Sequence, residues 1–282
     1  MEPNRDRDGY VTVQENQQLP RISAVSLLDR KRRGEKIAML TAYDYPSAKI
    51  LDEVGVDVVL VGDSAGNVVM GRRDTLTVTV DEMVHHVRMV SAAVENALVV
   101  ADMPFLSYQV NPEEALRNAG RLVVEGGAQA VKLEGPADKF GEAIRKILGA
   151  GIPVMGHIGL TPQSVHQIGG YKVQGRTPES RARLKEEAQG LDRIGCFAIV
   201  LECIPADLGA EISQLVGVPT IGIGAGPACD GQVLVLHDAL GWGFAKFSKT
   251  FADVRALMRQ GCADYVRQVK EGVFPGKEHG FE

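Results

Sequence analysis

The stretch "PSAKILDEVGVDVVLVGDSAG" (residues 46–66) contains a helix-to-strand unit and the polar end of its strand. A proline in the first turn and a closing glycine predict a helix at residues 46–55. The run at residues 56–63 is almost continuously apolar, as in a parallel strand covered on both faces. Because it ends in Asp63 and Ser64, the question is whether Asp63 only forms a turn or is presented to a ligand.

The same unit recurs along the whole chain. Strands are predicted at residues 36–44, 56–63, 98–104, 130–135, 152–159, 197–204 and 218–226, with a last apolar segment at 231–240. Helices are predicted at residues 25–34, 46–55, 81–97, 112–127, 139–150, 178–194, 205–215 and 251–272. Residues 160–177 are rich in glycine and polar side chains, and they are predicted to lack regular structure.

This alternation predicts an α/β fold. About eight short strands in a chain of 282 residues fit a single (β/α)8 TIM barrel, and a doubly wound open sheet is the alternative. We expect a polar N-terminal arm at residues 1–20 and a tail at 275–282. Between them, residues 21–274 would form one catalytic barrel domain with a short N-terminal helix and a C-terminal helical segment.

Composition narrows the class of protein. The net charge of −5 gives no basic patch for nucleic acid, and no apolar run reaches the length of about 18 residues that spans a bilayer. The N-terminus also lacks the apolar core of a secretory signal, so we expect a cytoplasmic protein without nucleic-acid or membrane partners. The cysteines are dispersed, which indicates neither a zinc site nor a disulfide framework, and they are predicted to be buried: Cys196, Cys203, Cys229 and Cys262.

The predicted strands end in polar residues. In a barrel of this type the reaction site lies at the C-terminal ends of the strands. The residues at those ends are Asp44, Asp63 with Ser64, Asp102, Lys132 with Glu134, His157, and Glu202. Five successive strands, from the second to the sixth, thus end in ionisable side chains that would meet at one rim.

Each of these residues also has a plainer explanation. Asp63 and Asp102 precede turns and could cap them. Lys132 and Glu134 share a strand face and could form a salt bridge with each other, and His157 could be a hydrogen-bonded core histidine. Glu202 differs, because it follows the apolar run "AIVL", where a carboxylate is costly unless it is paired or used.

Taken together, the rim residues predict a magnesium site. Asp63, Asp102 and Glu134 offer hard oxygen ligands, which suit Mg²⁺ completed by water and substrate. Free coordination positions would accept a 2-oxo acid, whose keto oxygen the ion would polarise. Lys132 would then balance the substrate carboxylate, and Glu202 would act as a base. The glycine-rich residues 222–231 lack nucleotide-binding spacing and predict a close-packed barrel loop.

The motifs at these strand ends resemble the ketopantoate hydroxymethyltransferase family. The segments that carry the resemblance occur in order between Leu40 and Asp238. They are "TAYDYPSA", "LVGDSAGNVVMG", "ADMPFLSY", "VKLEG", "GHIGLTPQSV", "GGYKVQGR", "LECIP" and "GIGAGPACDGQVLVLHD".

The resemblance implies a fold, a reaction and an assembly. It implies a (β/α)8 barrel with one Mg²⁺ per subunit that transfers a hydroxymethyl group from 5,10-methylenetetrahydrofolate to 3-methyl-2-oxobutanoate. The product, 2-dehydropantoate, belongs to pantothenate and coenzyme A biosynthesis. The resemblance also implies a homodecamer of two five-membered rings.

The resemblance further implies roles for individual residues. Asp63 and Asp102 would bind the metal, with Glu134 in the same shell, directly or through water. Both aspartates would also lie near the oxo acid, which Lys132 and Ser64 would hold. Glu202 would be the proton acceptor in the catalytic step. His157 would lie in the active site, but the resemblance defines no role for it.

Two other functions are open from the residues alone. A metal-dependent barrel lyase or mutase acting on 2-oxo acids would use the same acids without folate. A catalytically silent barrel could serve as a binding or assembly protein, although Glu202 is retained.

Overall fold

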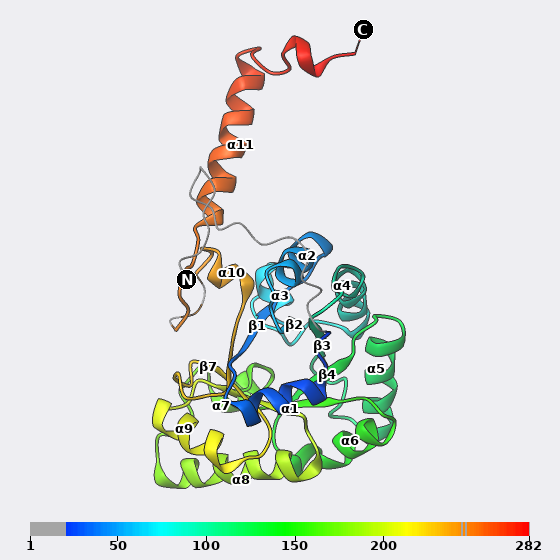
Figure 1. Cartoon of the computed structure of the whole chain (residues 1–282), viewed down its shortest axis with the longest axis vertical. Coiled ribbons are helices and arrows are strands. Elements are labelled where there is room, and N and C mark those ends of the chain that lie inside the picture. Colours follow the sequence, from blue (N-terminus) through cyan, green and yellow to red (C-terminus); the bar gives the residue numbers. More distant parts are fainter. Residues whose placement is uncertain (1–20, 244, 246, 282) are drawn as a thin grey trace. The chain divides into compact units, whose positions relative to one another are not determined.

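In the computed structural model, eight parallel strands close into a barrel in chain order, and residues 21–243, 245 and 247–281 are described (Figure 1). The strands are β1 (Ile37–Thr41), β2 (Val58–Val61), β3 (Leu98–Asp102), β4 (Ala130–Glu134), β5 (Val154–Gly159), β6 (Ala198–Glu202), β7 (Thr220–Ile223) and β8 (Gly231–Leu234). Closure confirms the predicted TIM barrel and excludes the doubly wound open sheet.

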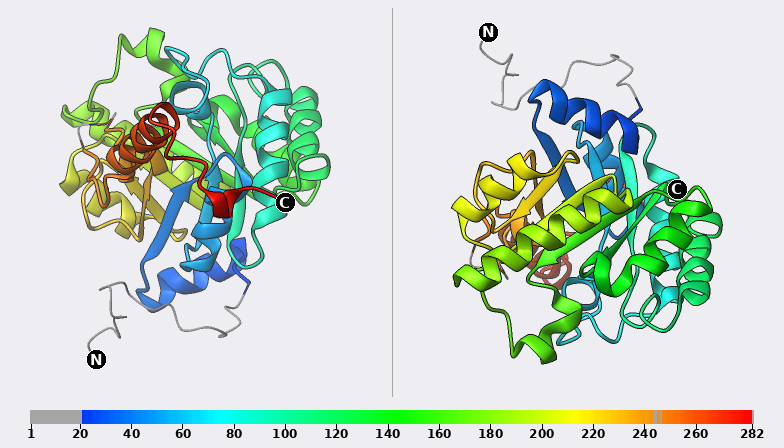
Figure 2. Two further views of the ribbon diagram at one scale, coloured as in Figure 1. Left: turned by 90° about the horizontal axis from the view of Figure 1, so that it is seen from above. Right: turned by 90° about the horizontal axis from the view of Figure 1, so that it is seen from below.

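In both views of Figure 2 the helices between residues 80 and 215 lie outside the strands, and along the chain strands alternate with helices. The α-helices are α1 (Ala24–Arg33), α2 (Tyr45–Glu53), α3 (Ala65–Val68), α4 (Val80–Ala93), α5 (Pro112–Val124), α6 (Ala137–Gly149), α7 (Val165–Ile168), α8 (Pro178–Ile194), α9 (Ala206–Leu215), α10 (Leu236–Ala239) and α11 (Val254–Lys270). Two 3₁₀ turns, η1 (Pro162–Ser164) and η2 (Lys277–His279), complete the elements.

Three local expectations were wrong. The segment 160–177 contains η1 and α7 rather than irregular chain alone. The last apolar segment, 231–240, divides into β8 and α10, and α3 follows β2 without having been predicted. All three involve helices or turns of three or four residues, which are too short to show a 3.6-residue apolar period.

The barrel core is built from the inward-facing positions of the strands. Leu98 and Val100 on β3, Met155 on β5, and Val200 on β6 belong to one buried apolar cluster. Leu27 of α1 is fully buried in the same cluster, which covers the N-terminal ends of the strands. From β3 to β6 the inward positions therefore change from apolar to ionisable only toward the C-terminal ends of the strands.

The chain forms two compact units that divide after Val233. The first unit contains the barrel up to β8, and the second contains α10, α11 and η2. The predicted arm at residues 1–20 lies outside the described residues, and the predicted domain limits at 21–274 stay a prediction. None of the helices in the described part of the chain has the length and apolar character needed to span a bilayer.

The cysteine prediction holds only in part. All four thiols are free, and Cys196 and Cys229 are buried as predicted. Cys203 is partly exposed and Cys262 is exposed. Cys262 lies on α11, a helix without a buried residue, so its burial was wrongly predicted.

Candidate active site

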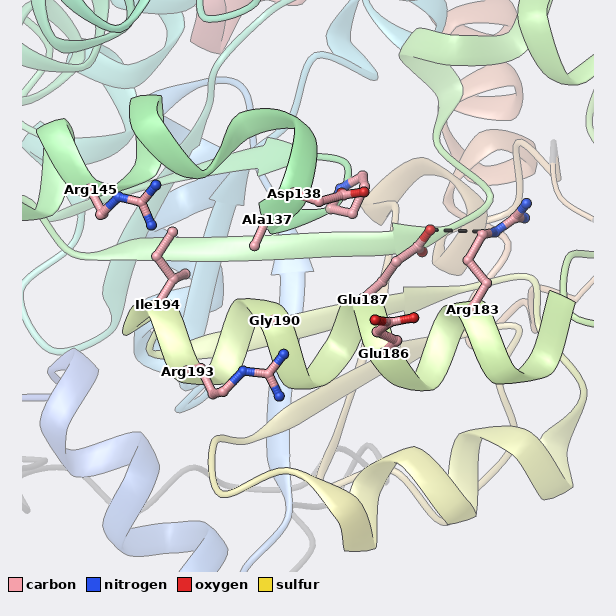
Figure 3. A pocket seen from close by; sticks show the side chains of 10 residues that line it. Ala137, Asp138, Arg145, Arg183, Glu186, Glu187, Gly190, Arg193 and Ile194 are labelled. Atoms are coloured by element: carbon pink, nitrogen blue, oxygen red, sulfur yellow. Dashed lines mark ion pairs between the residues drawn. The ribbon is translucent and has the colours of Figure 1, made fainter. Parts of the chain in front are cut away.

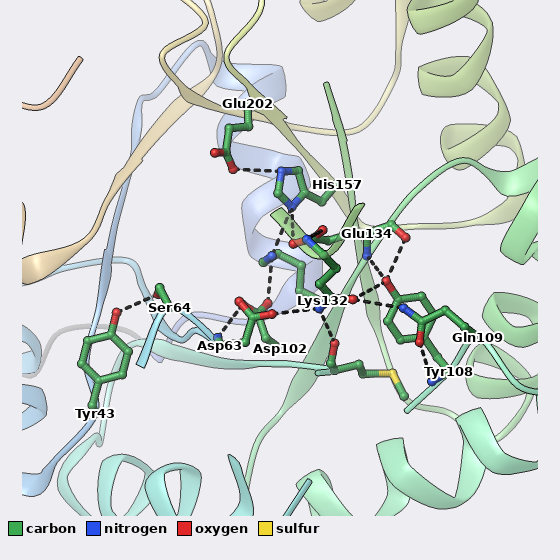
Figure 4. A network of polar contacts seen from close by, with 12 residues as sticks. Tyr43, Asp63, Ser64, Asp102, Tyr108, Gln109, Lys132, Glu134, His157 and Glu202 are labelled. Atoms are coloured by element: carbon green, nitrogen blue, oxygen red, sulfur yellow. Dashed lines mark hydrogen bonds and ion pairs between the residues drawn. The ribbon is translucent and has the colours of Figure 1, made fainter. Parts of the chain in front are cut away.

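Strand register brings the ionisable side chains together at the C-terminal mouth of the barrel (Figure 4). Asp102 on β3 is the neighbour of Lys132 on β4, and Glu134 on β4 is the neighbour of His157 on β5. Each of these four residues is at least nine-tenths buried. Because parallel strands in register place matching side chains side by side, the spacing of the residues in the sequence produces the contacts described below.

Asp63 lies just beyond β2, held close to Asp102 by a glycine. A Cβ atom at Gly62 would lie 2.7 Å from Ser64 Oγ and 3.4 Å from Asp102 Oδ2, so a side chain there would force the turn apart. The backbone N–H of Asp63 donates to Asp102 Oδ2 over 3.0 Å. Asp102 thus accepts a hydrogen bond from the turn after β2, which holds its carboxylate beside Asp63.

Lys132 is paired with Asp102 rather than with Glu134. Its Nζ lies 2.9 Å from Asp102 Oδ1 and 3.3 Å from His157 Nδ1. An ammonium group can only donate, so His157 Nδ1 accepts and the ring proton resides on Nε2. That nitrogen lies 3.2 Å from Glu202 Oε2.

Glu202 therefore lies beside a neutral histidine. Burial and the nearby charge of Lys132 lower the pKa of His157, which keeps the ring uncharged. Glu202 itself is the most accessible of the candidate acids, with 14% of its side chain exposed. Its carboxylate faces the mouth, where a substrate would enter.

The site contains more buried carboxyl groups than cations. Burial, followed by repulsion from Asp102, raises the pKa of Asp63 to about 7. Burial and the charge of Asp63 raise the pKa of Glu134 well above its ordinary value. Burial opposes the charge of Lys132, yet the surrounding carboxylates, led by Asp102, raise the pKa of its ammonium group. One cation among three carboxylates leaves room for further positive charge.

These carboxylates fit a Mg²⁺ ion that keeps water and substrate as ligands. In the described residues, no three His, Cys, Asp or Glu side chains form a ready-made metal cage. Asp102 Oδ1 is buried and has no hydrogen bond despite its ion pair with Lys132. Mg²⁺ is commonly held by one or two carboxylates and keeps its other positions for water and substrate oxygens. The donor set is all oxygen, which matches that ion.

Ser64 is held by a residue that the sequence did not single out. The Tyr43 hydroxyl lies 2.8 Å from Ser64 Oγ, and the Tyr43 carbonyl lies 2.7 Å from His86 Nδ1. Burial raises the pKa of Tyr43, so its phenol stays neutral. Neither Tyr43 nor His86 ends a strand in a recognisable pattern, so the sequence carried little signal for them.

Gln163 was also missed, although it lies within the motif "GHIGLTPQSV". Its Nε2 donates to Asp63 Oδ2 over 2.9 Å, and its backbone N–H donates to Glu134 Oε2 over 2.9 Å. The residue belongs to η1, in the segment predicted to be irregular.

Two other features lie outside this cluster. Asp44 is exposed and accepts a hydrogen bond from the Ser47 N–H over 2.9 Å, so it caps α2 rather than joining the site. A cavity of about 440 Å³ lies between α6 and α8, lined by Arg145, Glu187 and Arg193 among others (Figure 3). None of the candidate site residues lines it.

Comparison with known proteins matches this site to one family. A family profile described as ketopantoate hydroxymethyltransferase matches residues 21–277. A 3-methyl-2-oxobutanoate hydroxymethyltransferase of Syntrophomonas wolfei is 53% identical over 266 residues, covering 93% of this chain and 96% of the relative. Another, from Syntrophotalea carbinolica, is 56% identical over 254 residues, covering 89% of this chain and 95% of the relative. The chain belongs to the ketopantoate hydroxymethyltransferase family.

Solved structures of other enzymes share the fold of this ketopantoate hydroxymethyltransferase family member. A phosphonopyruvate hydrolase in complex with oxalate and Mg²⁺ has a TM-score of 0.62 at 12% identity and covers 93% of this chain and 92% of its own. A 2,3-dimethylmalate lyase of the PEP mutase/isocitrate lyase superfamily has a TM-score of 0.58 at 18% identity, covering 92% and 91%. At such low identity these likenesses support the barrel fold alone.

Proposed function

We propose that this protein transfers a hydroxymethyl group from 5,10-methylenetetrahydrofolate to 3-methyl-2-oxobutanoate and so forms 2-dehydropantoate. One observation carries the proposal: a partly exposed base, Glu202, lies in the same barrel mouth as an electron-rich oxygen cluster built around Lys132. A base beside groups that can hold an oxo acid is what removal of its C3 proton requires.

The chain's own residues divide the work as follows. Lys132 and Ser64 hold the substrate carboxylate, and Tyr43 keeps the Ser64 hydroxyl in place. Glu202 takes the proton from C3, and its carboxylate lies 3.2 Å from His157 Nε2. The resulting enolate carbon then attacks the methylene carbon of the folate, which the barrel mouth brings close to it, as one of the two C–N bonds of that carbon breaks. Water displaces the remaining folate nitrogen from the carbon, which supplies the hydroxyl oxygen and releases tetrahydrofolate.

We also propose one Mg²⁺ per subunit, held by Asp63 and Asp102 with Glu134 nearby. When bound, the ion would polarise the keto oxygen and stabilise negative charge on the substrate. The buried surplus of carboxylates over cations supports this assignment. The cytoplasmic location predicted from the N-terminal sequence stays a prediction.

We further propose a homo-oligomer, with the decamer of the family as its form. The exposed face of α11 supports an assembly. None of its residues is buried, and it exposes apolar side chains along its length: Leu257, Met258, Tyr265, Val266 and Val269. A helix with such a stripe in water is stabilised when the stripe is covered.

A product assay tests the proposed reaction. The protein is incubated with 3-methyl-2-oxobutanoate, 5,10-methylenetetrahydrofolate and Mg²⁺, with and without a chelator. We expect 2-dehydropantoate only when both substrates and the metal are present. Cleavage or rearrangement of the oxo acid without folate would instead identify a lyase or mutase, and binding without turnover would identify a silent barrel.

A further inference from the structure

Gln163 lies where the chain after β5 enters the active site. It is 6% exposed, and its side-chain amide uses all of its hydrogen-bonding capacity. Nε2 donates to Asp63 Oδ2 and to the Met103 carbonyl, each over 2.9 Å. Oε1 lies 2.8 Å from the Tyr108 hydroxyl and accepts from Gln109 Nε2 over 3.1 Å.

These contacts allow only one orientation of the amide. Turning it over would place Oε1 against the carboxylate of Asp63 and the carbonyl of Met103, both of which only accept hydrogen bonds. It would also point the NH₂ group at Gln109 Nε2, which only donates. The amide N–H is therefore fixed toward Asp63.

The backbone of the same residue holds a second carboxylate. The Gln163 N–H donates to Glu134 Oε2 over 2.9 Å, so one residue anchors acids that follow or end two different strands, β2 and β4. In each case one carboxylate oxygen is fixed by an N–H and the other is left for a second partner. The anchored oxygens set the direction in which the second oxygens point.

We propose that Gln163 is a positioning residue that orients Asp63 and Glu134 toward a divalent cation and the oxo acid. The inference rests on the proposed function, because it assumes that these carboxylates serve a metal-assisted reaction. Gln163 contacts neither the cation nor the reacting atoms in this arrangement. It acts through the two carboxylates, in the way that outer hydrogen-bond partners tune metal ligands.

The test replaces the amide without changing the size of the side chain. In Gln163→Met the side-chain hydrogen bonds are lost and the backbone N–H stays. We expect binding of Mn²⁺, measured by electron paramagnetic resonance on metal-free protein, to weaken about 10- to 100-fold. The KM for the oxo acid should rise with it, while circular dichroism stays that of the wild type.

Two further variants separate positioning from folding. Gln109→Leu removes one hydrogen bond to Oε1 and should weaken Mn²⁺ binding about two- to tenfold. Gln129→Leu is the matched control: its Oε1 accepts from the Val99 N–H over 2.9 Å, far from the mouth, so it should lower Tm and leave Mn²⁺ affinity unchanged.

The outcomes distinguish this inference from the proposed function. Wild-type Mn²⁺ affinity in both Gln163→Met and Gln109→Leu would overturn the positioning role alone. A wild type that binds no Mn²⁺ would overturn the proposed metal and this inference together. If Gln163→Met fails to fold, Gln109→Leu decides: weakened binding supports the role, and unchanged binding overturns it.

Discussion

Buried carboxylates are the residues on which the site depends. Asp63, Asp102 and Glu134 are each 4% exposed, and the single buried cation near them is Lys132 among the described residues. Burying like charges together costs free energy unless a proton or a cation compensates them. The pKa values of Asp63 and Glu134 are raised because of this free-energy cost. The buried carboxyl groups would favour binding of a cation, and they lower the free energy of unfolding of the metal-free protein.

The pH dependence of stability follows from Asp63. Its pKa rises from an ordinary 3.8 to about 7 in the folded protein, so the folded state holds more protons than the unfolded state between those values. Stability of the metal-free protein should therefore fall as pH rises through that window. We expect Tm, followed by circular dichroism with a chelator present, to drop by a few degrees.

Added Mg²⁺ should oppose that loss. The ion binds the ionised carboxylates, so it should raise Tm more above about pH 7 than below about pH 5. Asp63→Asn is the control, because it removes one of the two carboxyl groups of the site with a raised pKa and should reduce the slope of the profile. A wild-type Tm that is constant over this range, or one that responds equally to Mg²⁺ at both ends, would contradict the surplus of buried carboxyl groups.

The charged residues of the candidate site were the ones that could be predicted from the sequence. Asp63, Asp102, Lys132, Glu134 and Glu202 were predicted because an ionisable residue after an apolar strand is unusual. The supporting residues Tyr43 and Tyr108 come from loops and Gln163 from the 3₁₀ turn η1. All three are uncharged, and their contacts depend on chain directions that the local sequence does not encode. Asp44 is also charged and also follows a strand, β1, but it caps α2 and does not belong to the site.

At the scale of elements, strand ends and the loops beyond them position the site. Apolar runs located every strand of the barrel, but the runs extended past the hydrogen-bonded residues, as β2 and β7 show. The segment after β5 was predicted to be irregular because it is rich in glycine and polar residues, but it contains η1 and α7. The apolar runs therefore predicted the regular elements but not the short 3₁₀ turn that contains Gln163.

Gly159 links the end of β5 to Glu202, the proposed base. Its φ is +95°, and a Cβ atom there would lie 2.3 Å from the Glu202 carbonyl oxygen. Gly159→Ala should therefore lower the free energy of unfolding by about 2 kcal/mol or more and reduce activity. Urea unfolding and the product assay measure the two effects.

Gly149, at the end of α6, is the matched control for Gly159. An added Cβ there meets nothing within 4 Å. Gly149→Ala should raise the free energy of unfolding by about 0.5–1 kcal/mol, because alanine favours helix over glycine. Equal effects of the two substitutions would show that the β5 end is not tightly packed against β6.

On the scale of the whole molecule, the two compact units differ in burial. The barrel unit has a continuous apolar interior, whereas α11 in the second unit has no buried residue. The sequence predicted both the barrel and a C-terminal helical segment. It did not predict that the helix would leave its apolar side chains exposed, because the alternation of strands and helices says nothing about which helix is covered.

Oligomer formation should depend on the apolar stripe of α11. The double variant Leu257→Glu with Tyr265→Glu places charge on that stripe and should lower the molar mass measured by light scattering after size-exclusion chromatography. Gln260→Glu, also exposed and on the opposite face of α11, is the control and should keep the wild-type mass. A wild type with the mass of one chain, or a double variant with the mass of the wild type, would contradict the proposed assembly.

Proton removal by Glu202 is the central claim, and deuterium exchange measures it directly. Protein, Mg²⁺ and 3-methyl-2-oxobutanoate are placed in D₂O without folate, and loss of the C3 proton signal is followed by NMR. We expect exchange in the wild type and in Glu187→Gln, a half-buried acid on α8 away from the site, and none in Glu202→Gln. Exchange at the wild-type rate in Glu202→Gln, with Mg²⁺ still bound, would remove Glu202 from its role as the base.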